Sequence, residues 1–266
     1  MSASVTVRAA AKALAWASAT VPPTTLRVAA PGKSREEIQR ELAGEGVKTR
    51  TGPFSPDALV VESGNVQSSR CLAEGRGVIQ DEASQLVAPL VAPHPGQRVL
   101  DLCAAPGMKT SQLAAVLGMG TLVACDLSAN RLRTMARVLR GKIPAEVRFH
   151  VVRLDATLAP PFAGAFDRIL LDVPCSGTGT LARNPEIKWR LQARDLPRLA
   201  ATQAKMLCGA LRALAPGGRL VYATCSLEPE ENEQVAERAL QAARGYRLLT
   251  AGELAAESPA LAPLFD

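Results

Sequence analysis

The stretch VLDLCAAPGMKTSQLA, from Val99 to Ala114, has the pattern of a buried strand that turns sharply into a helix. Apolar residues dominate its first part, Pro106 and Gly107 interrupt them, and a helix-forming segment follows. Small residues fill the turn, so the backbone there can approach a bound molecule closely. The stretch therefore predicts the strand-to-helix connection at which an α/β domain binds a ligand.

The same alternation of strand and helix continues on both sides of this turn. We expect strands within segments 98–103, 121–126, 147–155, 168–174 and 219–225, and helices at 82–91, 110–117, 130–140 and 197–214. Near-continuous apolar strands separated by helices are typical of a parallel sheet that is covered on both faces. The predicted fold is therefore α/β, a doubly wound Rossmann-like domain over residues 76–266.

Residues 1–75 have a different pattern. TLRVA (25–29) and ALVVES (58–63) are predicted strands, and between them Ser34 begins a helix with the pattern of a capping box. A strand, a helix and a second strand in so short a segment predict a small α+β unit. The first 35 residues contain Arg8, Lys12, Arg27, Lys33 and Arg35 and no acid, a composition typical of an organellar transit peptide. Ala9–Ala19 also has the composition of a plain Ala-rich helix.

The 266-residue chain is moderately basic, with a net charge of +6 and a pI near 9.2. Its cations cluster in two stretches, with Arg131, Arg133, Arg137, Arg140, Lys142, Arg148 and Arg153 in the first and Arg183, Lys188, Arg190, Arg194, Arg198 and Lys205 in the second. This balance suits a polyanionic partner, although solvated helix faces explain it equally well. No apolar run approaches the length of a membrane span, so we expect no membrane association.

The cysteines and histidines exclude several kinds of site. The six cysteines form no CxxC pair and only two histidines are present, which disfavours both a zinc site and a disulfide framework. We therefore expect no metal and a reducing, cytoplasmic environment. His94 and His150 do not follow a predicted strand at its carboxyl end, which disfavours a Cys-His hydrolase.

An acid follows the ligand-binding turn at the place where Rossmann-like domains hold the ribose of an adenosine. Asp126 ends the strand predicted after the turn, and Asp155 ends the strand after that. The turn lacks the full glycine set that favours a pyrophosphate, and Pro106 removes a backbone donor. S-adenosylmethionine, which carries no phosphate, therefore fits better than a nicotinamide dinucleotide. The alternative is that the small residues serve only tight packing of strand on helix.

Two cysteines lie at the carboxyl ends of predicted strands, Cys175 in RILLDVPCSGTGT and Cys225 in YATCSLEPEENE. Methyl transfer to oxygen or nitrogen does not need a thiol. Transfer to C5 of cytosine does, because that carbon is a poor nucleophile until a thiolate adds to C6. A second cysteine can then assist release of the product, and the residues alone leave open which sulfur attacks. Cys71, Cys125 and Cys208 lack such a setting, and we expect them to be inert.

Three motifs, DLCAAPGMKT, ILLDVPCSGTGTLARNPEIKWR and YATCSLEPEENE, together resemble the Sun-type RNA (cytosine-5) methyltransferases, in particular their bacterial RsmB-like branch. The resemblance also includes VIQDEASQLVAPLV and extends from about residue 16 to the end of the chain. It implies a class I methyltransferase domain that depends on S-adenosylmethionine, and an RNA partner. It also implies that the small unit at 1–75 is of an RNA-binding type.

Carried over position by position, the resemblance implies a role for each matching residue. Cys225 corresponds to the nucleophile and Cys175 to the cysteine that promotes product release, whereas DNA cytosine-5 methyltransferases attack with the cysteine of a Pro-Cys pair. Asp172 is expected to share a proton with cytosine N3, and Lys109 to orient that carboxylate or lower a thiol pKa. The residues expected to contact or border the cofactor are Cys103, Ala104, Ala105, Pro106, Gly107, Met108, Lys109, Asp126, Asp155 and Asp172.

Two further segments of the motifs have expected roles. In the family, segment 184–189 faces RNA, although Trp189 can equally be a core anchor beneath a loop. Residues 230–232 are expected to brace the Cys225 loop by capping the helix that follows.

The sequence departs from the family pattern at four points. Met108 replaces a glycine, Val173 replaces an alanine, the extra N-terminal RNA-binding domain of full-length relatives is absent, and the chain ends at PLFD before a final strand. We expect a cytoplasmic, monomeric enzyme that forms 5-methylcytosine in ribosomal RNA of the 16S type. The alternatives are a transfer RNA substrate, or a truncated module that binds RNA and S-adenosylmethionine without turnover. A nicotinamide-dependent dehydrogenase is a distant third.

Overall fold

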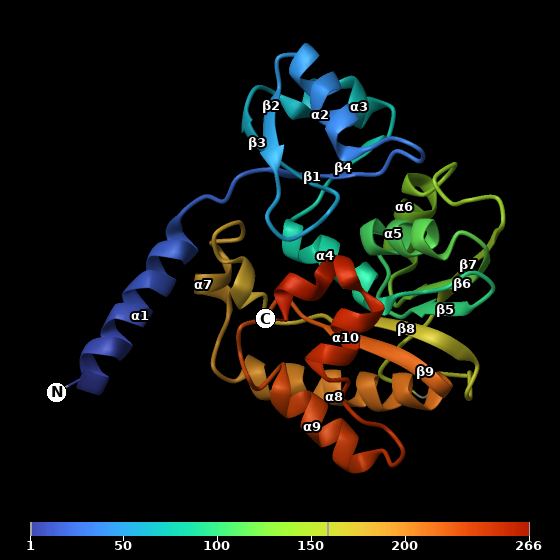
Figure 1. Ribbon diagram of the computed structural model, residues 1–266. Helices are drawn as coiled ribbons and strands as arrows, with labels where there is room; N and C mark the ends of the chain where they lie inside the picture. The colour runs from blue at the N-terminus through green and yellow to red at the C-terminus, as the bar shows by residue number, and fades with distance from the viewer. Residues whose placement is uncertain (1, 159, 266) are drawn as a thin grey trace.

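The computed structural model describes residues 2–158 and 160–265, which form two units of unequal size (Figure 1). The larger unit has a sheet of five parallel strands in the order β7-β6-β5-β8-β9. The smaller unit has a sheet of four antiparallel strands in the order β2-β3-β1-β4. The expected α/β fold with a small α+β unit before it is confirmed.

The larger unit alternates strand and helix along the chain. Its elements are α4 (Glu82–Val91), β5 (Arg98–Asp101), α5 (Met108–Leu117), β6 (Gly120–Asp126), α6 (Ala129–Val138), β7 (Val147–Arg153), β8 (Phe166–Asp172), η2 (Thr178–Thr180), α7 (Ile187–Arg190), α8 (Asp195–Ala213), β9 (Leu214–Ala223), α9 (Glu233–Ala242), α10 (Ala251–Glu257) and η3 (Pro259–Leu264). The strand order reverses between β5 and β8. In open parallel sheets, ligands bind at such a switch point, outside the carboxyl ends of the strands.

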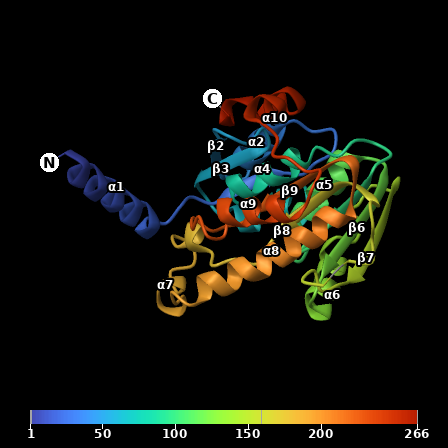
Figure 2. The same cartoon turned by 90° about the horizontal axis from the view of Figure 1, so that it is seen from below.

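Helices cover both faces of the parallel sheet, as the two views show (Figure 1 and Figure 2). Helices α4 and α5 pack on one face, where Val99, Leu113 and Leu122 are fully buried. Helices α8 and α9 pack on the other face against residues such as Leu100 and Ile169. This arrangement leaves the strand ends as the accessible edge of the sheet. Among the described residues, no helix is long and apolar enough to cross a bilayer.

The smaller unit contains one strand more than expected between its helix and ALVVES. Its elements are β1 (Thr25–Val28), α2 (Arg35–Gly44), β2 (Lys48–Thr51), β3 (Ala58–Ser63), η1 (Val66–Ser68), α3 (Arg70–Ala73) and β4 (Gly77–Ile79). Helix α1 (Ser2–Ala19) precedes β1 and stands apart from this sheet (Figure 1). The capping box is present at the start of α2, where Ser34 and Glu37 exchange hydrogen bonds. Strand β2 is short and polar, so its sequence does not indicate a strand. It becomes one because it pairs with β3. Strand β4 lies beyond the boundary expected at residue 75.

Both faces of the small sheet are covered. On one face β1 and β3 pack against α2, with Leu26 and Leu42 fully buried. On the other face the Arg27 guanidinium donates to Gln80 Oε1 at 2.7 Å and to Ser111 Oγ of α5 at 3.3 Å. Burial lowers the pKa of Arg27, which is 4 % exposed. The small unit is thus fastened to the helix that follows the predicted cofactor turn.

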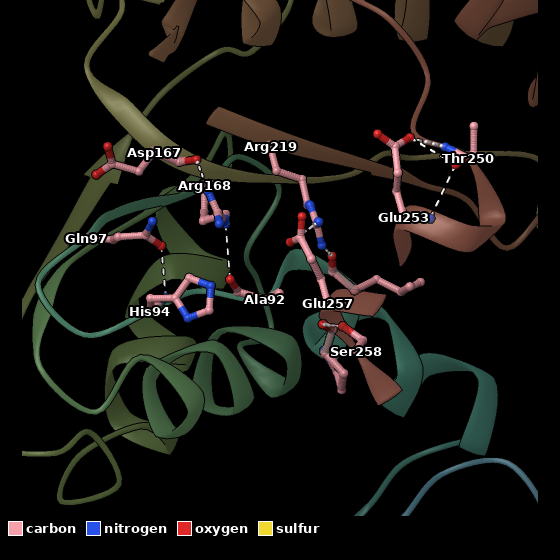
Figure 3. A network of polar contacts seen from close by, with 12 residues as sticks. Ala92, His94, Gln97, Asp167, Arg168, Arg219, Thr250, Glu253, Glu257 and Ser258 are labelled. Carbon is pink, nitrogen blue, oxygen red and sulfur yellow. Dashed lines mark hydrogen bonds and ion pairs between the residues drawn. The ribbon is translucent and has the colours of Figure 1, made fainter. Parts of the chain in front are cut away.

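Two arginines on neighbouring strands of the parallel sheet donate hydrogen bonds to the carboxyl end of α4 (Figure 3). Arg168 and Arg219 are paired residues on β8 and β9. The Arg168 Nε donates to the Ala92 carbonyl and an Arg219 Nη donates to the Leu90 carbonyl, each at 3.1 Å. Arg219 also forms an ion pair with Glu257 of α10. These cations therefore satisfy helix carbonyls that lack a partner within the helix.

We expect Arg219→Met to lower the free energy of unfolding by about 1.5–3 kcal/mol, because charged hydrogen bonds to buried groups contribute this much. Arg219 is 7 % exposed and donates both to a helix carbonyl and to a carboxylate. Urea unfolding measures the change. The control Arg244→Met alters an exposed arginine and should stay within about 0.5 kcal/mol of wild type. Equal stability of the two variants would contradict the structural role of Arg219.

Candidate active site

The carboxyl ends of β5, β6, β8 and β9 bring the sequence motifs to one edge of the sheet. The turn after β5 carries the small residues of the predicted cofactor loop, and Asp126 ends β6. Asp172 ends β8, and the loops after β8 and β9 carry Cys175 and Cys225. Residues distant in sequence therefore face a common site.

The two motif cysteines are in contact. Their sulfur atoms lie 3.1 Å apart although the residues are 50 positions apart in sequence. The Cys225 N–H also donates to the Cys175 sulfur at 3.3 Å. Cys225 is exposed and Cys175 is half-buried, and both are free thiols. The structure thus places the two sulfurs as a single reactive pair.

The contact between the sulfurs gives the two thiols different pKa values. The hydrogen bond from the Cys175 thiol lowers the pKa of Cys225 to about 7, because it stabilises the thiolate of Cys225. Burial and the charge of Asp172 oppose this shift, whereas the charge of Lys109 supports it. The same hydrogen bond and burial raise the pKa of Cys175. Of the two thiols, Cys225 is therefore the more readily deprotonated.

A buried carboxylate holds the two cysteine loops together. Glu231 is fully buried, and its Oε1 accepts from the Ser176 N–H at 2.9 Å and from Gln203 Nε2 at 2.8 Å. Gln203 Nε2 also donates to the Pro174 carbonyl at 2.9 Å, and Ser176 Oγ lies 3.0 Å from Ser226 Oγ. Burial would raise the pKa of Glu231, but hydrogen bonds from Ser176, Ser226 and Gln203 outweigh it and lower the pKa. Glu231 therefore remains an anion that fixes both loops.

The prediction that residues 230–232 cap α9 is wrong. Asn232 is the N-cap residue, but its side chain makes no capping hydrogen bond. Its Nδ2 donates instead to the carbonyls of Ser226 and Glu228, and its Oδ1 accepts from the Thr224 hydroxyl at 2.6 Å. The Asn232 side chain thus braces the Cys225 loop directly, and it does so in place of capping the N-terminus of α9.

Lys109 connects the cofactor loop with the cysteine loops. Its ammonium donates to the Asp172 carboxylate at 2.6 Å, and both side chains are largely buried. The contact joins the first turn of α5 to the end of β8. The expected pairing of these two residues is present in the structure.

The predicted ribose-binding acid lies beneath the cofactor loop. Asp126 is 4 % exposed, accepts from the Ser128 N–H at 2.9 Å, and lies 3.3 Å from a guanidinium nitrogen of Arg131. Arg131 also donates to the Ala105 carbonyl, so it links the acid to the loop. Asp155 instead accepts from the hydroxyl and N–H of Thr157, which lower its pKa. Its carboxylate organises its own turn.

Beside the cysteines, α7 presents a cationic aromatic surface. Ile187 is buried against Gly177, whose φ is +78°, and a Cβ at Gly177 would lie 3.9 Å from Cys225 Sγ. Trp189 is 88 % exposed, so the alternative of a core anchor is wrong. Arg183 in the same loop donates to Asp81 and to the Pro23 carbonyl. The Cys175 loop is therefore also fastened to the smaller unit.

A protein-family model described as 16S rRNA methyltransferase RsmB/F matches residues 88–259. This chain belongs to that family. It is 40 % identical over 217 residues to ribosomal RNA small subunit methyltransferase B of Klebsiella pneumoniae, covering 80 % of this chain and 49 % of the relative. It is 41 % identical over 233 residues to the Pseudomonas putida protein of the same name, covering 86 % and 52 %. The chain thus spans about half the length of these curated relatives.

Solved structures agree with the fold. A methyltransferase homolog from Pyrococcus horikoshii superposes with a TM-score of 0.74 at 31 % identity, covering 86 % of this family member and 72 % of that chain. NSun6 from the same organism, solved with SFG, gives a TM-score of 0.79 at 21 % identity, covering 91 % and 85 %. The expected family is confirmed, and with it the methyltransferase type of the fold.

One carboxylate of this family member was missing from the predicted site. Asp101 ends β5, is 1 % exposed, and accepts from the Thr110 hydroxyl through Oδ2 at 2.8 Å. Among the described residues nothing hydrogen-bonds its Oδ1, and burial raises its pKa to about 7. A cationic ligand with an ammonium group suits this site. A pyrophosphate does not, because the acidic side chains of Asp101, Asp126 and Asp172 would oppose its negative charge. S-adenosylmethionine fits these residues, and the position of Asp101 at the end of a strand was the sequence signal that could have found it.

We expect alkylation of Cys225 to follow a thiolate with a pKa of about 7, so the rate should rise through pH 7 as the thiol deprotonates. In Cys175→Ala the donor is lost, and the midpoint should move up toward about 8.5, the pKa of an ordinary thiol. Iodoacetamide labelling over a pH series, read by peptide mass spectrometry, measures both midpoints. Cys208→Ala is the control. An unchanged midpoint in Cys175→Ala would contradict the inequality of the two thiols.

We expect Glu231→Ala to lower the free energy of unfolding by about 2–4 kcal/mol, since it leaves two buried donors without an acceptor. The adjacent Glu230→Ala alters an exposed side chain and should stay within about 0.5 kcal/mol of wild type. Because the loops lose their common anchor, the alkylation midpoint of Cys225 should also rise in Glu231→Ala. Denaturant unfolding and labelling of the same samples test both effects. A wild-type midpoint in Glu231→Ala would show that the pair is held by other contacts.

Proposed function

We propose that this chain is the catalytic part of an S-adenosylmethionine-dependent RNA methyltransferase that forms 5-methylcytosine in ribosomal RNA of the 16S type. The observation that carries the proposal is the 3.1 Å contact between Cys175 and Cys225, with Cys225 the more acidic thiol. Transfer of a methyl group to C5 of cytosine requires such a nucleophile. The family match supports the ribosomal substrate.

The cofactor would lie at the loop after β5. The loop comprises Cys103, Ala104, Ala105, Pro106, Gly107 and Met108, and Lys109, Asp126, Asp155 and Asp172 would border the bound cofactor. Asp126 would accept from the ribose hydroxyls, and the buried Asp101 would face positive charge. When bound, the cofactor supplies the methyl group.

In the proposed reaction, the Cys225 thiolate forms a bond to C6 of cytosine, and the displaced electron pair moves to N3. Asp172 would share a proton there, and Lys109 holds its carboxylate at 2.6 Å. C5 then becomes nucleophilic and accepts the methyl group. After the C5 proton leaves to a base, the bond between C6 and sulfur breaks. The Cys175 thiol, whose sulfur lies 3.1 Å from the Cys225 sulfur, would donate to the departing thiolate and stabilise it.

Three observations bear on the alternatives. Attack by Cys175, as in the DNA enzymes, is disfavoured because its pKa is raised and that of Cys225 is lowered. A module without turnover is disfavoured because both sulfurs and the network that holds them are intact. A transfer RNA substrate is disfavoured by the family description.

The proposed partner is RNA, bound by a monomer in the cytoplasm. Trp189 with Lys188 and Arg190 on α7 would contact RNA beside the target base, because exposed aromatics stack on unpaired bases. The small unit, expected at 1–75 and extended by β4, would hold RNA next to the Cys175 loop. The hydrogen bond from Arg183 of that loop to the Pro23 carbonyl supports this role.

We expect wild type to transfer tritiated methyl groups from S-adenosylmethionine to unmodified small-subunit ribosomal RNA. Cys225→Ala should reduce incorporation to background because no adduct can form. Cys175→Ala should accumulate a covalent protein–RNA adduct, visible on a denaturing gel, because release of the sulfur is slowed. Cys208→Ala, which changes a cysteine on α8 outside the site, is the control and should match wild type.

Each contrary outcome has a distinct meaning. An adduct with Cys225→Ala would reverse the roles of the sulfurs. Incorporation into transfer RNA alone would overturn the ribosomal substrate. Binding of S-adenosylmethionine without incorporation into either RNA would favour the module without turnover.

A further inference from the structure

Helix α6 carries a row of cations on its exposed side. Arg133, Arg137 and Arg140, the last just beyond the helix, recur every three or four residues and are all exposed. In the part of the chain that the structure describes, none of the three forms an ion pair, and Arg133 and Arg137 donate to the uncharged Asn130 and Thr134. Together these residues line a shallow surface hollow of about 660 Å³.

The row continues toward the smaller unit. Lys142 follows Arg140 in the chain and is exposed, and its Cε lies 3.4 Å from where a Cβ of Gly75 would be. At the other end, Arg131 in the first turn of α6 donates to the Ala105 carbonyl of the cofactor loop. We name Arg133, Arg137, Arg140 and Lys142 the α6 strip. The strip therefore extends from the neighbourhood of the cofactor loop to the small unit.

A solvated helix face does not account well for this arrangement. Solvated faces ordinarily mix charges of both signs, and like charges four residues apart destabilise a helix. Between Leu127 and Leu154 the sequence contains one acid, Glu146, against seven cations. Positive charge concentrated in this way is the pattern of a surface that binds a polyanion.

We propose that the α6 strip binds backbone phosphates of the substrate RNA, away from the cytosine that is modified. This inference rests on the proposed function, because it takes the polyanion to be the methylated RNA. Arginine presents a planar fork of donors that matches the geometry of a phosphate. Phosphate contacts position a nucleic acid without reading its sequence. The strip thus holds the RNA in register, and the cysteine loops act on the target base.

The test compares two triple variants with the same loss of charge. Arg133→Gln/Arg137→Gln/Arg140→Gln removes the arginines of the strip. The control is Arg212→Gln/Arg238→Gln/Arg244→Gln, which removes three exposed arginines from α8, α9 and the turn after α9, on the opposite face of the sheet. Fluorescence anisotropy with transcribed small-subunit ribosomal RNA measures Kd over a series of KCl concentrations. Thermal unfolding confirms that both variants are folded.

At physiological salt, the Kd of the strip variant for RNA should be at least about tenfold higher than that of wild type. The slope of log K against log salt should become shallower by about 2, because each lost phosphate contact removes about 0.7–0.9. The control should retain the Kd and slope of wild type. In methylation assays the strip variant should raise KM for RNA and leave kcat at saturating RNA unchanged.

Other results would overturn the proposal. Equal Kd values and salt slopes in the two triple variants would mean that net charge alone, and not the strip, attracts RNA. A wild type with no measurable affinity for this RNA would also overturn it. The binding assay needs no methyl transfer, so it is judged separately from the proposed function. Strip-dependent binding without methylation would refute the function alone, and methylation with unchanged KM and Kd in the strip variant would refute the strip alone.

Discussion

The site depends on one buried anion, the carboxylate of Glu231. A carboxylate removed from water is costly unless hydrogen bonds replace its hydration, and here Ser176 and Gln203 supply them. Because these donors come from the Cys175 loop and from α8, the carboxylate draws together segments that are far apart in the sequence. The serine pair Ser176 and Ser226 then fixes the second cysteine loop. The contact between the sulfurs is a consequence of this network.

The parallel sheet supplies the second constraint. Because all five strands run in one direction, the loops after β5, β6, β8 and β9 emerge at one edge. The ion pair between Lys109 and Asp172 crosses the switch point between β5 and β8, and so connects the cofactor side with the cysteine side. Polar groups at this edge therefore influence one another. The pKa of Cys225 responds to its partner thiol, to Asp172 and to Lys109 together.

Recognition of a large substrate requires more surface than the site offers. The small unit is held to the large one by hydrogen bonds from Arg27 to Ser111 of α5 and from Arg183 of the Cys175 loop to the Pro23 carbonyl. Trp189 is exposed on α7, and Ile187 of the same helix lies against Gly177 near the Cys225 sulfur. The α6 strip lies over another part of the surface and reaches the small unit near Gly75. In the proposed function, chemistry and RNA positioning therefore belong to different elements of the chain.

The sequence by itself determined the alternation of strands and helices, the capping box at Ser34, and the motifs that carry Cys175 and Cys225. These features are local, because periodicity, caps and turn residues act over a few positions. Tertiary structure alone decided that KTRT is a strand, that Trp189 is exposed, and that Asp101 and Glu231 are buried in the site. It also decided that the sulfurs of Cys175 and Cys225 are in contact. Each of these depends on contacts between residues far apart in the chain, which no local pattern records.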